Sequence, residues 1–321
     1  MVSLTDVKEA YERIRRASIQ TPLMTSLTAN RWTNCSIFFK CENFQRIGAF
    51  KFRGAYNAIS QLTQKEKDRG VITHSSGNHG QAVAQAAKML GIKATIVMPT
   101  NSSPVKIAAT KEYGATVEFC DPDQKSREKV TNALIKKHRF VLIHPYDNPQ
   151  VIAGAGTAAY ELISEVGALD VMFAPVGGGG LVSGTAIATK GLCPTAKVFA
   201  VEPEQADDAY RSFKTGTIVP SENPITIADG LRTSLSELTF SIIQKHVDDI
   251  ITVSEEEILD AMKFLWERMK LVIEPSGAVP LAGLFKLKDL LDNQRIGIVL
   301  SGGNVDLTSF FDQWRKEIKE N

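Results

Sequence analysis

Short apolar runs alternate with longer amphipathic segments along most of this chain. Eight of the runs have the length of strands, and several are rich in β-branched residues and bounded by Gly, Pro, Asn or Asp, as buried strands are. These runs are residues 37–40, 71–74, 94–98, 116–119, 140–144, 171–175, 197–201 and 295–300. The segments between them follow a helical period. In residues 254–271, for example, apolar residues recur on one stripe and Ser254 is placed to cap the first turn.

Strands and helices that alternate along a chain are joined by crossover connections, which favour a mostly parallel sheet covered by helices. We therefore predict an α/β fold. Four strand–helix units between residues 71 and 144 suit a small domain inserted into a larger one. The predicted boundaries are 1–65 and 148–321 for the large domain and 66–147 for the small domain. Residues 205–229 lack a regular pattern, and we expect them to form a long functional loop.

Composition narrows the class of protein. The 321 residues include 37 Lys and Arg against 36 Asp and Glu, and this near-zero net charge argues against a nucleic-acid or polybasic membrane surface. No apolar run approaches the roughly 18–20 residues of a membrane span, and residues 1–21 lack the apolar core of a signal peptide. The four cysteines lie far apart without a CxxC pair, which argues against a zinc cluster or a disulfide framework. We expect a cytoplasmic protein.

The first candidate for chemistry is Lys51, which lies among apolar residues at the start of a predicted helix. Desolvation and the positive end of the helix dipole both favour the neutral amine. A neutral amine is the form that condenses with an aldehyde, so Lys51 is a candidate Schiff-base lysine. Most lysines at such positions are solvated surface residues, and this segment alone does not decide between the two readings.

The second candidate is the turn Thr73-His74-Ser75-Ser76-Gly77-Asn78-His79-Gly80, between a predicted strand and a predicted helix. A turn of small residues that enters a helix presents backbone N–H groups to an anion, and Ser and Asn side chains add further donors. This pattern suits a carboxylate, and the hydroxyls could also carry protons. An ordinary capped helix start is the alternative reading.

The third candidate is the run of four glycines at Gly177–Gly180, which follows the predicted strand 171–175. Glycines allow the main chain to approach a ligand closely, and the helix that follows favours a phosphate. A dinucleotide fingerprint does not fit, because Val182 or Ser183 takes the place of its third glycine. We therefore prefer a cup for a single phosphate over a structural turn. A phosphate cup, an aldehyde-reactive lysine and a carboxylate-binding turn together describe pyridoxal 5'-phosphate holding an amino acid.

These motifs, in this order, resemble the fold-type II pyridoxal-phosphate enzymes of the serine racemase and serine/threonine dehydratase group. The resemblance covers nearly the whole chain. The chain is similar to the eukaryotic racemase branch in particular at residues 38–42, 144–145, 226–230, 247–249, 266–270, 273–275 and 300–306. It implies a fold like that of the tryptophan synthase β chain, with two open, twisted, mostly parallel sheets flanked by helices. It also implies a homodimer, and from the two-lobed layout we expect the small domain to move over the active site.

The resemblance assigns a role to each motif. Lys51 would carry the cofactor and move the Cα proton on one face of the substrate, and Ser76 would be the base on the opposite face. Ser301 would meet the pyridine nitrogen, and Asn78 the phenolic oxygen. The substrate carboxylate would be held by Ser75, Ser76, Asn78 and His79. The remaining cofactor contacts would come from Phe50, Gly177, Gly178, Gly179, Gly180, Leu181 and Glu274.

Inversion at Cα requires two bases, because a single base can return the proton only to the face from which it came. Elimination requires one base and a proton for the departing hydroxyl. The resemblance therefore implies interconversion of L- and D-serine together with β-elimination of serine to pyruvate and ammonia. The alternative is a dehydratase only, acting on L-serine, L-threonine or 3-hydroxyaspartate. A third reading, a non-catalytic binding protein, is disfavoured by the intact motifs.

Residues 202–208 resemble the divalent-cation loop of the same family. The matching ligands are Glu202, the carbonyl of Ala206 and Asp208, and ligation by oxygen alone suits Mg²⁺, Ca²⁺ or Mn²⁺. Without the resemblance, carboxylates in such a loop would be read as solvated.

Mammalian members of the family are activated by ATP, and the positions that match their nucleotide site are Ser26, Arg46 and Gln81. Gln81 is retained, whereas Arg46 replaces a lysine and Leu27 replaces a serine. Tyr146 replaces an asparagine near the cofactor. ATP is therefore an expected activator that these departures call into question.

Overall fold

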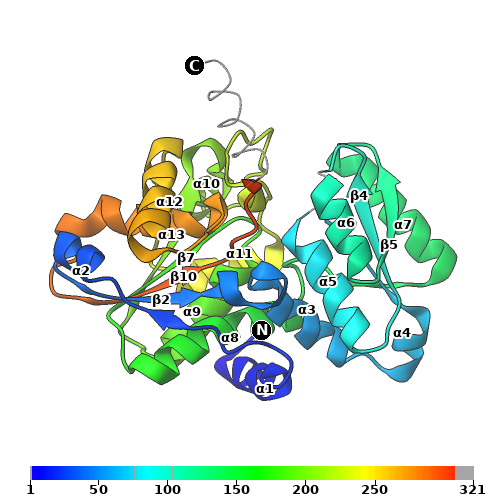
Figure 1. The fold of residues 1–321 in the computed structure, drawn as a ribbon, viewed down its shortest axis with the longest axis horizontal. Helices are drawn as coiled ribbons and strands as arrows, with labels where there is room; N and C mark the ends of the chain where they lie inside the picture. Colours follow the sequence, from blue (N-terminus) through cyan, green and yellow to red (C-terminus); the bar gives the residue numbers. More distant parts are fainter. Residues whose placement is uncertain (1, 76, 103, 308–321) are drawn as a thin grey trace.

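The computed structural model describes residues 2–75, 77–102 and 104–307, and within these ranges the strands form two sheets (Figure 1). The six-stranded sheet has the order β1-β2-β10-β7-β8-β9, and every neighbouring pair in it is parallel except β1 with β2. Its strands are β1 (Leu23–Met24), β2 (Ser36–Cys41), β7 (Val171–Pro175), β8 (Lys197–Pro203), β9 (Asp249–Val253) and β10 (Arg295–Leu300). The last strand of the described residues, β10, thus lies between two earlier ones.

The four-stranded sheet lies at the other end of the molecule and is parallel throughout, in the order β5-β4-β3-β6 (Figure 1). Its strands are β3 (Val71–His74), β4 (Ala94–Pro99), β5 (Thr116–Cys120) and β6 (Val141–Leu142). The helices of this part are α4 (Gln64–Arg69), α5 (Asn78–Met89), α6 (Pro104–Glu112) and α7 (Gln124–His138). The α/β class with two mostly parallel sheets is therefore confirmed.

Helices cover both faces of the six-stranded sheet, because its strands are apolar on both sides. Along β7, Met172 and Ala174 pack with α8, α9 and α11, whereas Val171 and Phe173 pack with α12 and α13. This alternation follows the two-residue period of a strand. The helices of this part are α1 (Leu4–Ile14), α2 (Leu27–Thr33), α3 (Lys51–Ser60), α8 (Pro149–Val166), α9 (Gly180–Leu192), α10 (Asp208–Thr215), α11 (Glu237–His246), α12 (Glu255–Met269) and α13 (Pro275–Leu287).

Glycines let three of these helices approach one another closely. A Cβ atom at Gly184 of α9 would lie 2.4 Å from the carbonyl oxygen of Ile152 in α8. A Cβ atom at Gly154 of α8 would lie 2.6 Å from the carbonyl oxygen of Arg53 in α3. Because α3 also packs against α5, it connects the helices of the large sheet with those of the small one.

Most of the predicted elements are present, and two local predictions need correction. All eight predicted strands occur, and Ser254 caps α12 through a capping box with Glu257. The two-residue strand β1 and the five-residue strand β9 were not predicted. Residues 205–229 were expected to be an irregular loop, but α10 occupies residues 208–215. The sequence signal was missed because α10 is capped by Glu202, which lies in β8 rather than directly before the helix.

None of the helices in the described residues is both long and apolar enough to cross a membrane.

Candidate active site

The three motifs meet at one cavity between the two sheets. Its wall includes Lys51 of α3, the turn that follows β3, the glycine run that follows β7, and Ser301, which follows β10. Three of these segments lie directly after the carboxyl ends of parallel strands, where ligands of open α/β sheets usually bind. The remaining predicted cofactor contacts in the wall are Phe50, Asn78, Leu181 and Glu274.

Lys51 is the first residue of α3, and its Nζ atom donates a hydrogen bond to the carbonyl oxygen of Pro145 at 3.1 Å. Burial lowers the pKa of Lys51 to about 8, and the nearby Glu274 carboxylate opposes this shift. A lowered pKa makes the neutral amine available near neutral pH, as the sequence argument required. Lys51 can therefore act as a nucleophile or as a base in this cavity.

The glycine run makes a tight turn into α9 that side chains would obstruct. Gly179 has a φ of +86°, and a Cβ atom at Gly178 would lie 2.3 Å from the ring of Tyr146. No side chain of the described residues caps the first turn of α9, so its backbone N–H groups are available to a ligand. Such N–H groups at the positive end of a 13-residue helix suit a phosphate.

Asn78 lies at the start of α5 and is held by residues from the opposite side of the cavity. Its Nδ2 atom donates to Oε1 of Glu274 at 2.8 Å, and its Oδ1 atom accepts from Nδ2 of Asn304 at 2.8 Å. Asn304 also donates to the carbonyl oxygen of Ile47 at 2.7 Å. No local sequence pattern singles out Asn304, because only the folded chain places it beside Asn78.

Glu274 is buried, and this burial raises its pKa to about 7, with Asp229 adding to the shift. Ser301 is also buried, and its carbonyl oxygen accepts a hydrogen bond from the backbone N–H of Phe50 at 3.0 Å. Ser301 thus lies next to the start of the lysine-bearing helix, which is consistent with a shared role around one cofactor.

The turn that we predict to bind a carboxylate lies at the cavity, where α5 begins. Ser75 lines the cavity, and its Oγ atom accepts a hydrogen bond from the backbone N–H of Gly77 at 3.2 Å. His79 is buried and its Nε2 atom lies 2.9 Å from the carbonyl oxygen of Ile143, so we assign the ring proton to Nε2. Burial also lowers the pKa of His79 well below 6.5, which keeps the ring neutral. Ser76 lies outside the described residues.

Cations from several elements also line this cavity, and none of them was predicted from the sequence. They are Lys106 of α6, Arg127 of α7 and Arg232, which follows the segment 226–230. Lys106 pairs with Asp229 at 2.8 Å, and Nε of Arg232 donates to the carbonyl oxygen of Thr226 at 2.9 Å. The Nε atom of Arg127 is buried without a hydrogen-bond partner among the described residues. No local pattern marks these residues, because they come from separate parts of the chain.

Glu202 and Asp208, which we call the acid pair, are fully buried at the end of β8 and the start of α10. The carboxylate of Glu202 accepts from the backbone N–H groups of Ala209 at 3.0 Å and Tyr210 at 2.8 Å. Within the described part of the chain, no hydrogen bond of normal length and angle reaches either oxygen of Asp208, although the nearby Ser221 hydroxyl partly offsets the rise in the Asp208 pKa. Burial and the Asp208 charge raise the pKa of Glu202 well above 4.5, and burial raises that of Asp208 to about 7.

Two buried carboxyl groups, one of which (Asp208) has unsatisfied oxygens, fit a hard divalent cation, which prefers oxygen ligands. The predicted third ligand, Ala206, is a buried residue of the 3₁₀ turn η3 (Glu204–Ala206) between them. The described residues contain no group of three or more His, Cys, Asp and Glu side chains arranged to hold a metal. Any ligation here would therefore depend on a backbone carbonyl as well as the acid pair.

The three predicted nucleotide residues have roles within the chain. Ser26 caps α2 by accepting from the backbone N–H of Ala29 at 3.2 Å. Arg46 lies over the ring of Phe52, and Gln81 is buried in α5. No hydrogen bond or ion pair joins Ser26, Arg46 and Gln81 to one another in the part of the chain that the structure describes.

Comparisons with known proteins agree with this geometry. The model of a family described as "Pyridoxal-phosphate dependent enzyme" matches residues 14–302. A serine racemase of Schizosaccharomyces pombe is 50% identical over 306 residues, which are 95% of each chain. An L-threo-3-hydroxyaspartate ammonia-lyase of Saccharomyces cerevisiae is 49% identical over 306 residues, which are 95% of this chain and 94% of that one.

Solved structures show the same likeness. The crystal structure of serine racemase from Dictyostelium discoideum has a TM-score of 0.91 and 50% identity, and the match covers 95% of this chain and 99% of that one. The structure of maize serine racemase has a TM-score of 0.96 and 40% identity, with coverage of 99% and 98%. The chain therefore belongs to the pyridoxal-phosphate dependent enzymes, in the fold-type II group that includes serine racemases and ammonia-lyases.

Proposed function

We propose that this protein is a serine racemase that interconverts L- and D-serine and also eliminates serine to pyruvate and ammonia. The observation that carries the proposal is the meeting of Lys51, the glycine run, Asn78 and Ser301 around a single cavity. Relatives named as racemases and as ammonia-lyases support both activities.

Pyridoxal 5'-phosphate, when bound, supplies an aldehyde and an electron-withdrawing ring that acidifies the Cα–H bond of an amino acid. The glycine run and the start of α9 would hold its phosphate, and Ser301 would face its ring nitrogen. Asn78, held by Glu274 and Asn304, would donate to its phenolic oxygen.

The chain's own residues would then move the Cα proton. The Lys51 amine, with its pKa of about 8, is partly neutral near pH 7.5 and can take a proton on its side of the substrate. The turn that leads into α5, with Ser75, Ser76, Asn78 and His79, would bind the substrate carboxylate. Ser76 would act as the base on the opposite face, a role supported only by the resemblance of its motif.

The role of Lys51 is tested by reducing the cofactor-loaded protein with borohydride and mapping its peptides by mass spectrometry. We expect a pyridoxyl adduct on the Lys51 peptide and none in Lys51→Ala, whereas the exposed-lysine control Lys65→Ala should keep it. An adduct elsewhere, or none, would remove the basis of the proposal.

The reaction is tested by chiral analysis of the products from L-serine. We expect both D-serine and pyruvate, and Ser76→Ala should suppress D-serine formation while it spares much of the elimination. Pyruvate without any D-serine would leave a dehydratase only.

A second candidate function, 3-hydroxyaspartate ammonia-lyase, is favoured by the cations in the cavity. A substrate with a second carboxylate would need a cation facing it, and Arg127 has a buried Nε atom without a partner in the described chain. Arg127→Gln should lower kcat/KM for L-threo-3-hydroxyaspartate by about 10- to 100-fold, because a charge-assisted contact is lost, while kcat/KM for serine changes little. Equal losses for both substrates would contradict this assignment.

Further properties belong to the proposal. We propose that the acid pair and the Ala206 carbonyl bind Mg²⁺, Ca²⁺ or Mn²⁺, which the unsatisfied oxygens of Asp208 support. A homodimer, activation by ATP and a cytoplasmic location are supported by the sequence alone. Closure of residues 66–147 over the cavity is supported by the compact four-stranded sheet within that range.

A further inference from the structure

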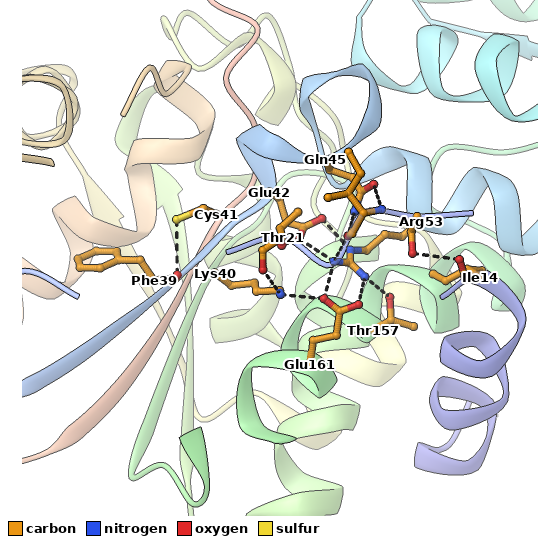
Figure 2. Close-up of polar contacts among 12 residues, drawn as sticks. Ile14, Thr21, Phe39, Lys40, Cys41, Glu42, Gln45, Arg53, Thr157 and Glu161 are labelled. Atoms are coloured by element: carbon orange, nitrogen blue, oxygen red, sulfur yellow. Dashed lines mark hydrogen bonds and ion pairs between the residues drawn. The ribbon is translucent and has the colours of Figure 1, made fainter. Parts of the chain in front are cut away.

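A second feature of α3 lies on the side of the helix that faces away from the cavity. Arg53 follows Lys51 by two residues, which places the two side chains roughly 200° apart around the helix axis. The guanidinium of Arg53 is fully buried between the carboxylates of Glu42 and Glu161 (Figure 2). Together with Lys40, these four residues form what we call the Arg53 cluster.

The guanidinium makes two bidentate ion pairs, one with each carboxylate, and we call each pair a fork. Its Nε and Nη2 atoms donate to the two oxygens of Glu42 at 2.7 and 2.9 Å, and its Nη1 and Nη2 atoms donate to those of Glu161 at 2.7 and 2.8 Å. Lys40 donates to Glu161 at 2.7 Å and to the carbonyl oxygen of Thr21 at 2.7 Å. The cluster thus balances two cations against two anions and joins β2, α3 and α8.

Stability alone does not account for such a cluster. Removing two cations and two anions from water costs several kcal/mol per ion, and apolar replacements of buried ion pairs are often neutral or stabilising. A planar guanidinium held by two forks does, however, set both the rotation and the axial position of the helix that carries it.

The start of α3 depends on such an external support. Among the described residues, no side chain caps this helix, and the residue before it is held by the hydrogen bond from the backbone N–H of Phe50 to the carbonyl oxygen of Ser301. The close approach of Gly54 and Gly154 presses α3 onto α8, the helix that also carries Glu161. The Arg53 forks are therefore a direct constraint on the first turn, which also carries Lys51.

We propose that Arg53 is a positioning residue for Lys51. Arg53 holds the first turn of α3 so that the amine of Lys51 stays in the wall of the cavity. The proposal rests on the proposed role of Lys51. Arg53 acts through geometry, since burial and Glu274 set the pKa of Lys51. The titratable groups that face Lys51 are Glu274 at the start of α13, His79 of α5 and His144 after β6.

The test reads the amine itself, in the full chain without added cofactor. Acetic anhydride labels neutral amines, and mass spectrometry of the Lys51 peptide gives the pH of half-maximal labelling. Arg53→Lys keeps the charge and loses the forks, so the loosened amine gains water and its half-maximal pH should rise by about one unit. With cofactor and serine, kcat should fall by about 10- to 100-fold with little change in KM, as expected of a misplaced reacting group.

The matched control is Lys40→Met, which removes a charge from the same cluster but does not lie on α3. It should lower the melting temperature and leave the labelling profile of Lys51 unchanged. If Arg53→Lys does not fold, Glu161→Gln weakens one fork and should shift the profile in the same direction. An unchanged profile in a folded fork variant, or an equal shift in Lys40→Met, would overturn the proposal.

The two proposals fail separately. A missing pyridoxyl adduct on Lys51 would refute the proposed function, because that experiment reads the cofactor. The labelling profile needs no cofactor and reports only whether Arg53 holds the amine in place.

Discussion

The Arg53 cluster and the acid pair are both buried groups of charged side chains, but only the first is balanced. In the cluster, the two cations and two anions are paired, and the Thr21 hydroxyl donates to Glu42 at 2.6 Å. In the acid pair, two carboxyl groups lie close together, and the oxygens of Asp208 have no partner in the described residues. The cluster is thus balanced within the chain, whereas the acid pair fits the cation that we propose to bind there.

The pKa values of the carboxyl groups in the cluster and in the acid pair are also shifted in opposite directions. The Arg53 guanidinium holds the pKa of Glu42 below its usual value of 4.5, even though burial alone would raise it. Burial raises the pKa of Asp208 from 3.8 to about 7. A fall in pH therefore removes the stabilisation that the Glu42 charge provides in the cluster, and it removes the destabilising buried charge of Asp208 in the acid pair.

The largest effect is expected from breaking the balance of the cluster. Glu42→Gln leaves an excess positive charge in the core and should lower the free energy of unfolding by about 3–5 kcal/mol. In the parent protein, the contribution of Glu42 is present above pH 4.5 and is lost as the pH falls through its lower folded pKa. Urea unfolding at pH 7 measures the first effect, and a variant as stable as the parent would contradict the view that the cluster is balanced.

A divalent cation should have the next largest effect, at the acid pair. Mg²⁺ at a hundred times its Kd should stabilise the folded chain by about 2.7 kcal/mol, since it binds only that state. The rise in melting temperature should be larger at pH 8 than at pH 5, because the carboxyl groups must lose their protons to bind. A melting temperature indifferent to both EDTA and Mg²⁺ would remove the metal from the proposal.

Removing one acid should have a smaller effect of the opposite sign to the first prediction. Without divalent cations, Asp208→Asn should raise the free energy of unfolding by about 1–2 kcal/mol at pH 8, because a buried unpaired charge is lost. The folded chain binds the Asp208 proton more tightly than the unfolded chain, so the cost of ionising Asp208 in the parent protein grows as the pH rises from about 4 to 7. The stability that Asp208→Asn gains should therefore shrink toward pH 4. Chemical unfolding in EDTA at pH 8 and pH 4.5 measures the difference. A variant less stable than the parent at pH 8 would show that the buried charge of Asp208 does not destabilise the folded chain.

The smallest effect is expected where a similar ion pair lies in solvent. Lys214 and Asp249 are 2.8 Å apart, but their side chains are 46% and 39% exposed. Lys214→Met should change the free energy of unfolding by less than about 1 kcal/mol, because water and salt screen the pair. The same urea series would measure it, and a loss comparable to that of Glu42→Gln would mean that burial is not what distinguishes the cluster.

Local patterns predicted much of the fold because their causes are local. The eight strands are short, mostly apolar runs, and α12 has its cap and its apolar stripe within its own sequence. By contrast, α10 was missed because its capping carboxylate belongs to β8, and β1 is too short to form a recognisable run. Elements whose termini are satisfied from elsewhere in the chain give no local signal.

The sequence by itself determined the α/β class, the order of the elements, and the three motifs around Lys51, Asn78 and the glycine run. Each of these depends on residues that are neighbours along the chain, so a periodic pattern or a short motif records it. Only the tertiary structure decided that Arg53 is held by Glu42 and Glu161, that Asn304 supports Asn78, and that cations line the cavity. These contacts join segments far apart in the sequence, and their energies depend on burial and distance, which exist only once the chain has folded.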